Sequence, residues 1–480
     1  MTKTINLTRE QNECVNFKGG DLLIKGVPGS GKSYVILKRA LKLYQDSNGI
    51  ASLKIFTYTN ALVKYTDEIL RAKIGGKGID VSTVDSYFME IYRSMARRSI
   101  YCNEKRCNEI IEKTLTDHSK LEKRTHRFYA IESDFWNEEF LWIQERCITS
   151  EQEYIKTSRR GCGSQVKIVS EADKKLAWSI YQLFRKNMKE GHCNTWPEMF
   201  LYINEHIQNI PEKYKVDYVF VDEAQDMTLG KMRALKAITR KSITIAADMA
   251  QKIYKTSFTW REAGIDIQGR ASKSLTRTFR STKQIVALAE DLALVTRKND
   301  SYKDELTEAV YPDSEGPIPW LFVFRSKLNE ESYMVNLVNK LLQQRSDKTI
   351  GVICKTKKYY YHIRASLRAK EIPFQEIFRD GKYIPDWRLL EPGLKLVVAK
   401  SSKGLEFDTV IIPDLDEGTY PFIPMKIDDE QMEEFLTTER NLLYVAMTRA
   451  RETLFMLCTD RNKSRFIAEF SESHYKRYNL

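Results

Sequence analysis

The chain has 480 residues, of which 42% are hydrophobic and 30% are charged. This composition is typical of globular proteins and excludes a largely disordered chain. The length is sufficient for two to four domains, each large enough to bury a core of its own. The formal net charge of +12 favours a polyanionic partner, with nucleic acid ahead of an anionic membrane surface.

Cysteine usage and hydropathy indicate the compartment. No stretch reaches the roughly 18 consecutive apolar residues of a membrane span. The first residues, MTKTINLTREQ, lack the apolar core of a signal peptide. None of the 8 cysteines forms a CxxC pair, which favours free thiols in a reducing compartment over a metal site. We therefore expect a cytoplasmic protein with no membrane partner.

Short apolar runs recur along the chain, and each is followed by a helical pattern. Continuous apolar strands that alternate with helices predict parallel sheets covered on both faces. The runs form two sets, so we expect an α/β fold with two parallel-sheet domains. The first set is 21–25, 54–59, 218–222 and 242–247, and the second is 319–324, 350–355, 395–399, 409–413 and 453–458.

One long stretch breaks this alternation. Residues 87–215 are rich in Glu, Lys, Arg and aromatic side chains, and their pattern predicts a mainly helical insertion. It interrupts the first domain, because the strand at 218–222 must return to the sheet that the strand at 21–25 begins. The predicted limits are 1–86 and 216–271 for the first domain, 87–215 for the insertion, and 272–480 for the second domain.

The sequence GVPGSGKS, residues 26–33, matches the pattern G-x-x-x-x-G-K-[ST] at every required position. A predicted strand precedes it and a helical pattern follows, which is the context that a phosphate-binding loop needs. Glycines let backbone N–H groups close around phosphate oxygens, and the helix N-terminus adds a favourable dipole. Lys32 would reach the β- and γ-phosphates of ATP, and Ser33 would ligate Mg²⁺. The predicted ATP-binding residues of the loop are Gly26, Gly29, Ser30, Gly31, Lys32 and Ser33.

A pair of acids follows a later apolar strand, in the sequence VFVDEAQD at residues 219–226. The carboxyl edge of a parallel sheet is where ligands bind. Asp222 would hold Mg²⁺, while Glu223 would orient the attacking water and take its proton. Two solvated acids at the start of a helix are the alternative for a DE pair alone. The phosphate-binding loop earlier in the chain favours the catalytic interpretation.

Together with further segments, these motifs resemble the UvrD/Rep/PcrA family of superfamily 1 helicases. The resemblance runs from LTREQ at residue 7 to TRARE ending at residue 452. It implies two RecA-like P-loop domains, with a helical insertion in the first and the cofactors ATP and Mg²⁺ between them. It also implies a DNA-stimulated ATPase that moves 3′ to 5′ along single strands.

The resemblance extends to residues that would surround the nucleotide. It implies that Gln11 reads the adenine edge and that Phe279 stacks on adenine. Gln251 would sense the γ-phosphate, and Arg280 and Arg449 would be arginine fingers. An arginine placed against the developing negative charge is worth roughly 10³ to 10⁵ in rate.

The segment AKSSKGLEF, residues 399–407, resembles another family motif. Here Gly404 and Glu406 would lie at the nucleotide, with Glu406 holding the ribose. Lys400 stands where the family usually has His, so the role of this position stays open.

Contacts with nucleic acid are also implied by the resemblance. Single-strand binders combine a basic groove with aromatic side chains on which bases stack. Core packing is the alternative for any one aromatic residue. The predicted nucleic-acid contacts are Tyr58, Thr59, Asn60, Tyr254 and Trp260, and a second contact segment is 82–87. The helical insertion, 87–215, is a further candidate for DNA contact.

The chain departs from larger family members in its second domain. Only residues 379–393 separate the segment 350–374 from the next strand, so the large insertion found there in the family is essentially absent. We therefore expect ATP hydrolysis and translocation, but the motifs do not predict processive unwinding.

Two functional hypotheses remain. The first is a 3′–5′ translocase or helicase that acts on single-stranded or tailed DNA. The second is a nucleotide-switched, DNA-sensing regulatory subunit of a repair or anti-phage defence complex, with a nuclease or another protein as partner and little unwinding of its own. Action on RNA also stays open, because such contacts touch mostly backbone and base faces.

Overall fold

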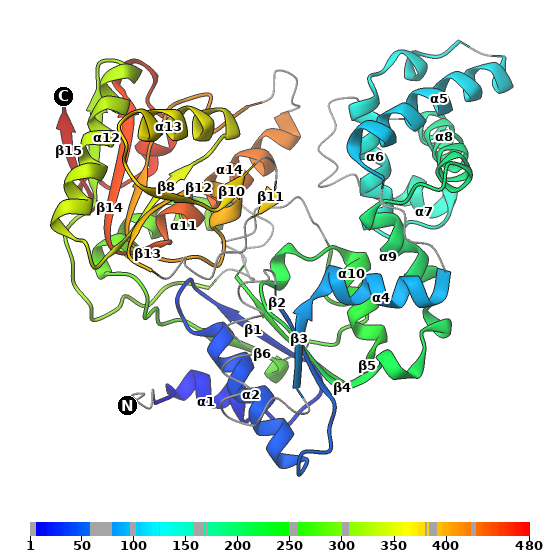
Figure 1. Cartoon of the computed structure of the whole chain (residues 1–480). Helices are drawn as coiled ribbons and strands as arrows, with labels where there is room; N and C mark the ends of the chain where they lie inside the picture. Colours follow the sequence, from blue (N-terminus) through cyan, green and yellow to red (C-terminus); the bar gives the residue numbers. More distant parts are fainter. Residues whose placement is uncertain are drawn as a thin grey trace.

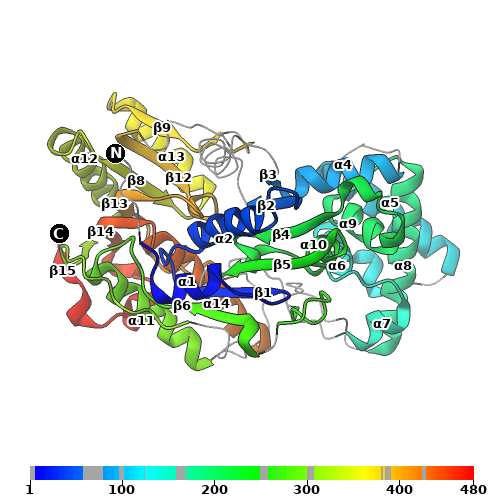
Figure 2. The same cartoon turned by 90° about the horizontal axis from the view of Figure 1, so that it is seen from below.

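The computed structural model describes residues 6–57, 79–96, 102–123, 125–157, 168, 170–248, 258–267, 269–299, 307–379, 382–383, 391–423 and 429–480. Two separate parallel sheets form its frame. Figure 1 shows the second sheet at the upper left and a bundle of helices at the upper right, with the first sheet below them, and in Figure 2 the first sheet lies between the two. The predicted fold class, two RecA-like α/β domains with a mainly helical insertion in the first, is confirmed.

The first sheet has six strands in the order β3-β2-β4-β5-β1-β6, and every pairing is parallel. Alternate residues of its central strands enter two different hydrophobic clusters. One cluster is covered by α1 and α2, and the other by α4, α9 and α10. This burial on both faces explains why the central strands are continuously apolar. The strands are β1 (Leu22–Gly26), β2 (Leu53–Thr57), β3 (Ile79–Thr83), β4 (Val216–Val221), β5 (Thr239–Ala247) and β6 (Ser272–Leu275), and the helices are α1 (Arg9–Val15), α2 (Lys32–Asp46), α4 (Val84–Ala96), α9 (Trp196–Glu205) and α10 (Leu229–Ala237).

Three elements lie outside the limits predicted for the first domain. The helices α4 and α9 place Phe88 and Met199 in the hydrophobic core of the first sheet. The strand β6 pairs with β1, with Ser272 opposite Leu23. The first sheet and its covering helices therefore extend beyond the predicted limits at 86, 216 and 271, because these elements have their apolar partners there.

The insertion has a core of its own, built from α5 (Glu104–Glu122), α6 (Ser133–Glu145), α7 (Glu151–Lys156) and α8 (Glu171–Glu190). Trp136, Phe140 and Tyr181 are fully or almost fully buried in it. The two ends of the insertion meet, since the backbone N of Cys102 donates to the carbonyl oxygen of Asn194 at 2.8 Å. We call this point of entry and exit the neck.

The second sheet has seven strands in the order β15-β7-β14-β13-β8-β12-β9, and every pairing is parallel. Its two faces are covered by α11 with α14 and by α12 with α13. None of the helices within the described ranges is long and apolar enough to cross a bilayer. The strands are β7 (Trp320–Phe324), β8 (Thr349–Cys354), β9 (Phe374–Glu376), β12 (Gly393–Val398), β13 (Phe407–Ile412), β14 (Ala450–Thr459) and β15 (Lys476–Asn479), the helices are α11 (Lys283–Asn299), α12 (Lys327–Gln344), α13 (Lys357–Ala369) and α14 (Asp429–Met447), and a separate hairpin pairs β10 (Phe378–Arg379) with β11 (Lys382–Tyr383).

Candidate nucleotide site

The predicted phosphate-binding loop joins β1 to α2. Gly29 and Gly31 have φ angles of 72° and 82°, in the left-handed region that favours glycine. A Cβ atom on Gly26 would lie only 2.7 Å from the hydroxyl oxygen of Ser30. The loop therefore needs its glycines for its own conformation, as a backbone cradle for phosphate does.

Lys32, in the first turn of α2, is buried. Its Nζ donates to the carbonyl oxygens of Gly26 and Val27, at 2.7 and 3.0 Å. It also lies 3.5 Å from a carboxylate oxygen of Asp248, which follows β5. The ammonium group is thus held over the loop by atoms of the first domain.

Ser33 and Asp222 meet although they are 189 positions apart in the sequence. The Ser33 hydroxyl donates to Oδ2 of Asp222 at 2.5 Å. Hydroxyl and carboxylate oxygens are hard ligands of the kind that Mg²⁺ prefers. The donor set therefore fits the predicted magnesium position.

The acid pair follows β4. Glu223 has a φ of 54°, a left-handed conformation that is uncommon outside glycine and occurs often at functional sites. Burial raises the pKa of Asp222 to about 6, and the adjacent Glu223 carboxylate adds to this effect. Burial also acts to raise the pKa of Glu223, but the cations of Lys403, Lys32 and Arg449 outweigh it and hold that pKa below its usual value. The geometry favours an ionised Glu223.

Residues that follow β6 cover the phosphate-binding loop from the other side. The backbone N of Phe279 donates to the carbonyl oxygen of Gly29 at 2.9 Å. A Cβ atom on Gly29 would lie 2.5 Å from Cβ of Arg280. The Arg280 guanidinium forms an ion pair with Glu406 at 2.6 Å. Phe279 is 55% exposed, and the Arg277 guanidinium lies 5.7 Å from the centroid of its ring.

Arg449 is 1% exposed and lies where α14 leads into β14. It donates to the carbonyl oxygens of Val445 and Leu405, at 2.9 and 3.3 Å. Burial lowers its pKa to about 10, and the neighbouring Arg280 contributes, against the opposing effect of Glu223. Arg449 therefore interacts electrostatically both with Arg280 and with Glu223 of the acid pair.

Gln11, another predicted nucleotide residue, lies against the loop. Gln11 donates from Nε2 to the carbonyl oxygen of Ser30 at 3.0 Å, while its Oε1 accepts from the backbone N of Thr8 in a capping box. Gly404 has a φ of 77°, so it supplies a turn two residues before Glu406.

Comparison with known proteins bears on both halves of the chain. The model of the UvrD/REP helicase N-terminal domain matches residues 7–276, and the model of the UvrD-like helicase C-terminal domain matches residues 274–380 and 393–461. The chain belongs to the UvrD/Rep family of DNA helicases.

Individual relatives of this UvrD-like chain are distant. It is 25% identical over 264 residues to a probable DNA helicase of Mycoplasma pneumoniae, and this match covers 50% of the chain and 43% of the relative. It is 23% identical over 409 residues to the ATP-dependent DNA helicase PcrA of Staphylococcus epidermidis, covering 79% and 52%. A shorter match, 28% over 106 residues, is to a subunit of the ATP-dependent helicase/nuclease of Lactobacillus gasseri, covering 18% and 9%. The chain spans about half the length, or less, of these curated relatives.

The predicted nucleic-acid contacts of the UvrD-like chain are placed only in part. Trp260 packs edge-to-face on Phe258, with ring centroids 5.6 Å apart, and against the core of the first domain while staying partly exposed. Its role in binding stays a prediction. The other predicted contacts, Tyr58, Thr59, Asn60 and Tyr254, lie outside the described residues, as does Gln251.

The second predicted contact segment, 82–87, begins beside the end of β2, where Thr57 pairs with Thr83. Strands β2 and β3 therefore both end at the carboxyl edge of the sheet. Tyr87 itself is part of the core, since its ring packs on Phe56 and its hydroxyl donates to the carbonyl oxygen of Tyr214 at 2.7 Å.

The motifs did not single out one residue of this site. Lys403 is 2% exposed, its Nζ pairs with Asp226, and it lies 3.8 Å from Oε2 of Glu223. Its position next to Gly404 in AKSSKGLEF was the available signal.

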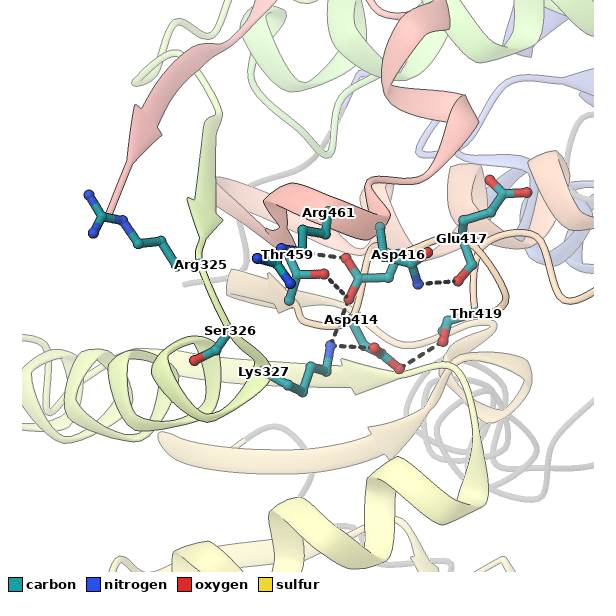
Figure 3. Close-up of a pocket in the computed structure, with 10 residues that line it drawn as sticks. Arg325, Ser326, Lys327, Asp414, Asp416, Glu417, Thr419, Thr459 and Arg461 are labelled. Carbon is teal, nitrogen blue, oxygen red and sulfur yellow. Dashed lines mark hydrogen bonds and ion pairs between the residues drawn. The ribbon is translucent and has the colours of Figure 1, made fainter.

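A pocket of about 380 Å³ opens at the carboxyl edge of the second sheet (Figure 3). Lys327 pairs there with Glu330 at 2.7 Å, with Asp414, and with Asp416 at 3.2 Å. None of its lining residues belongs to the predicted nucleotide site. The internal ion pairs of Lys327 therefore tie the start of α12 to the chain that follows β13.

Proposed function

We propose that this UvrD-like chain is a DNA-stimulated ATPase that moves 3′ to 5′ along single-stranded DNA and hydrolyses ATP between its two RecA-like domains. The observation that carries the proposal is the contact between Phe279 and Gly29, which joins the chain after β6 to the phosphate-binding loop. Arg280 and Arg449 accompany this contact. Phosphoryl transfer needs positive charge at the developing negative charge, and these arginines are suited to supply it.

The residues of the first domain have complementary roles in this proposal. Ser33 and Asp222 would hold Mg²⁺, which supplies neutralisation of phosphate charge when bound. Lys32 would add a fixed positive charge at the β- and γ-phosphates. Glu223, ionised in its cationic surroundings, would orient a water molecule and accept its proton.

Adenine recognition and γ-phosphate sensing complete the proposed nucleotide site. Gln11 and Phe279 would bind the adenine, Glu406 would bind the ribose beside Gly404, and Gln251 would sense the γ-phosphate. Because Arg280 pairs with Glu406, a bound nucleotide would compete for both side chains.

The nucleic-acid partner is proposed from charge and from the family. A net charge of +12 favours a polyanion, and Tyr58, Thr59, Asn60, Tyr254 and Trp260 would provide the contacts. The carboxyl edge of the first sheet, where β2 and β3 end together, supports this placement.

The test is ATP turnover without nucleic acid and with single-stranded DNA, blunt duplex, 3′-tailed duplex, 5′-tailed duplex or RNA. We expect single-stranded and 3′-tailed DNA to stimulate turnover most. Polarity follows from the arrival time of the protein at a fluorophore on either end of a single strand. Equal turnover with and without every nucleic acid would contradict the proposal.

The site assignment is tested by Lys32→Ala. Loss of the loop ammonium should lower turnover by at least about 10²-fold, because it removes a fixed charge from the transferred phosphoryl group. Lys42→Ala is the matched control, since Lys42 lies on the same helix and pairs with Asp46 at 3.1 Å. Full turnover by Lys32→Ala would refute the assignment.

A second function is favoured by the short second domain and by the similarity to part of a helicase/nuclease. In this alternative the chain senses DNA and its nucleotide state switches a nuclease or another protein, with little unwinding. Strand displacement by the isolated chain on 3′-tailed duplex, at a rate close to its ATP turnover, would rule it out. DNA-stimulated turnover without displacement would favour it.

A further inference from the structure

Lys403 belongs to the second domain, and its side chain contacts the acidic motif of the first. It follows η8 (Ala399–Ser402) and precedes β13. Its side chain is 1% exposed and pairs with Asp226, whose side chain is 0% exposed. The two residues are 177 positions apart in the sequence. Since both side chains are buried, the pair lies inside the contact between the two domains and not on their surface.

Glu223 is the second carboxylate within reach of Lys403, with Nζ 3.8 Å from Oε2. The same oxygen accepts a hydrogen bond from Nε2 of Gln225 at 2.6 Å. Gln225 is itself anchored, because its Oε1 accepts from the backbone N of Asp248 at 3.0 Å. One oxygen of the proposed water-activating group is therefore held by an amide of its own domain and by an ammonium of the other.

Charge and burial make this arrangement depend on the domain interface. A buried ammonium and a buried carboxylate each need the other, because either alone would be an uncompensated charge. If the second domain moved away, Asp226 and Glu223 would lose this cation together. The position of Glu223 is thus coupled to the docking of the second domain.

We infer that Lys403 is a positioning residue that sets the carboxylate of Glu223 only when the two domains are docked. Asp226 anchors the lysine, and Glu223 receives its effect. This inference rests on the proposed ATPase function and adds a device by which domain closure controls water activation. The arginines act on the phosphates, whereas Lys403 acts on the group that prepares the water.

The test compares Lys403→Met, Lys403→Arg, Asp226→Asn and the double variant Lys403→Met/Asp226→Asn by steady-state ATP turnover. Methionine keeps the length of the side chain and removes its charge. We expect Lys403→Met to lower kcat between about 10- and 100-fold, the effect of misplacing a catalytic group, with KM for ATP changed less than about threefold. Lys403→Arg should restore part of kcat. The double variant should be no slower than Lys403→Met, because the pair acts as a unit.

A purely structural role is separated by Lys236→Met, which removes an ion pair within the first domain, between the partly exposed Lys236 and the buried Asp21 at 2.6 Å. Its kcat should stay within about twofold of the wild-type value even if its unfolding temperature falls. If Lys403→Met does not fold, the kcat of Asp226→Asn tests the inference in its place. Unchanged kcat in both Lys403→Met and Asp226→Asn, or a rise in KM alone, would overturn the inference.

The outcome for the wild-type chain separates this inference from the proposed function. Turnover that DNA does not stimulate would contradict the proposed function, while basal kcat would still test Lys403. Absence of any turnover would contradict both.

Discussion

At the scale of single residues, Gly29 is where the phosphate-binding loop meets the chain after β6. Its carbonyl oxygen accepts a hydrogen bond from the backbone N of Phe279. Its φ is left-handed, and a Cβ atom at this position would also clash with Cβ of Arg280. A methyl group there would strain the backbone by roughly 1–2 kcal/mol and displace the arginine. The conformation of the loop and the position of Arg280 therefore both depend on Gly29.

We therefore predict that Gly29→Ala lowers ATP turnover at least about tenfold while the helix content stays that of the wild type. Turnover and circular dichroism measure the two quantities. Gly20→Ala is the control, because a Cβ atom at Gly20 would meet nothing within 4 Å. Equal turnover of the two variants would contradict the contact with Arg280.

Glu145 ends α6 in the insertion, and burial raises its pKa to about 7, against the opposing effect of Lys231. The folded state binds the proton of this carboxyl group more tightly than the unfolded state does. The protein therefore loses stability as the pH rises from the ordinary pKa of 4.5 through about 7. Glu145→Gln carries no charge at any pH. We predict that the variant gains up to about 2 kcal/mol over the wild type at pH 8 and little at pH 4.5.

Chemical unfolding at the two pH values checks this prediction. The quantity that matters is the difference between Glu145→Gln and the wild type, so other titrating groups cancel. The same difference at both pH values would show that folding does not raise the pKa of Glu145.

Much of the nucleotide site could be predicted at this scale, because spacing within one motif determines local geometry. Lys32 and Ser33 follow from the loop pattern, and Asp222 follows from a strand that ends in acids. The pairing of Lys403 with Asp226 could not be predicted, because it depends on how two domains pack. The position of Lys403 in AKSSKGLEF marks the residue, but nothing in a single sequence names Asp226 as its partner.

At the scale of elements, the predicted strands are the inner strands of the two sheets. The strands that the apolar runs did not indicate include β3, β6, β9 and β15, which are the four sheet edges. An inner strand is covered on both faces and is continuously apolar, whereas an edge strand tolerates polar residues. The sequence SKSL of β6 and the exposed KRYN of β15 illustrate the difference.

Lys327 pairs with Asp414 and Asp416 between α12 and the chain after β13 (Figure 3), where Glu330 also accepts a hydrogen bond from the backbone N of Asp414 at 2.7 Å. Glu330 is 0% exposed and would lose its cation in Lys327→Met. We predict a loss of about 3 kcal/mol in the free energy of unfolding, because a buried carboxylate would be left uncompensated. Denaturant unfolding measures it.

Lys327→Met/Glu330→Gln is the companion variant to Lys327→Met. The second substitution removes the buried charge, so it should recover part of the lost stability. If the double variant is less stable than Lys327→Met by the full cost of a second independent change, the two groups do not act as a pair.

At the scale of the whole molecule, the first sheet lies between the helical insertion and the second domain (Figures 1 and 2). The insertion packs beside α9 and α10, whereas the second domain meets the loop and the acid pair. The predicted order of domains along the chain could be read from alternating patterns. Their packing could not, since α4 and α9 lie in the predicted insertion yet complete the core of the first sheet.

The neck between Cys102 and Asn194 has a consequence for how such a protein changes over time. Because the two ends of the insertion are one hydrogen bond apart, the chain leaves the first domain and returns to it at nearly the same point. A different module could be spliced in at this point while the order of strands stayed the same. The neck therefore marks a position at which the length and content of the insertion can differ without a change in the strand order of the first sheet.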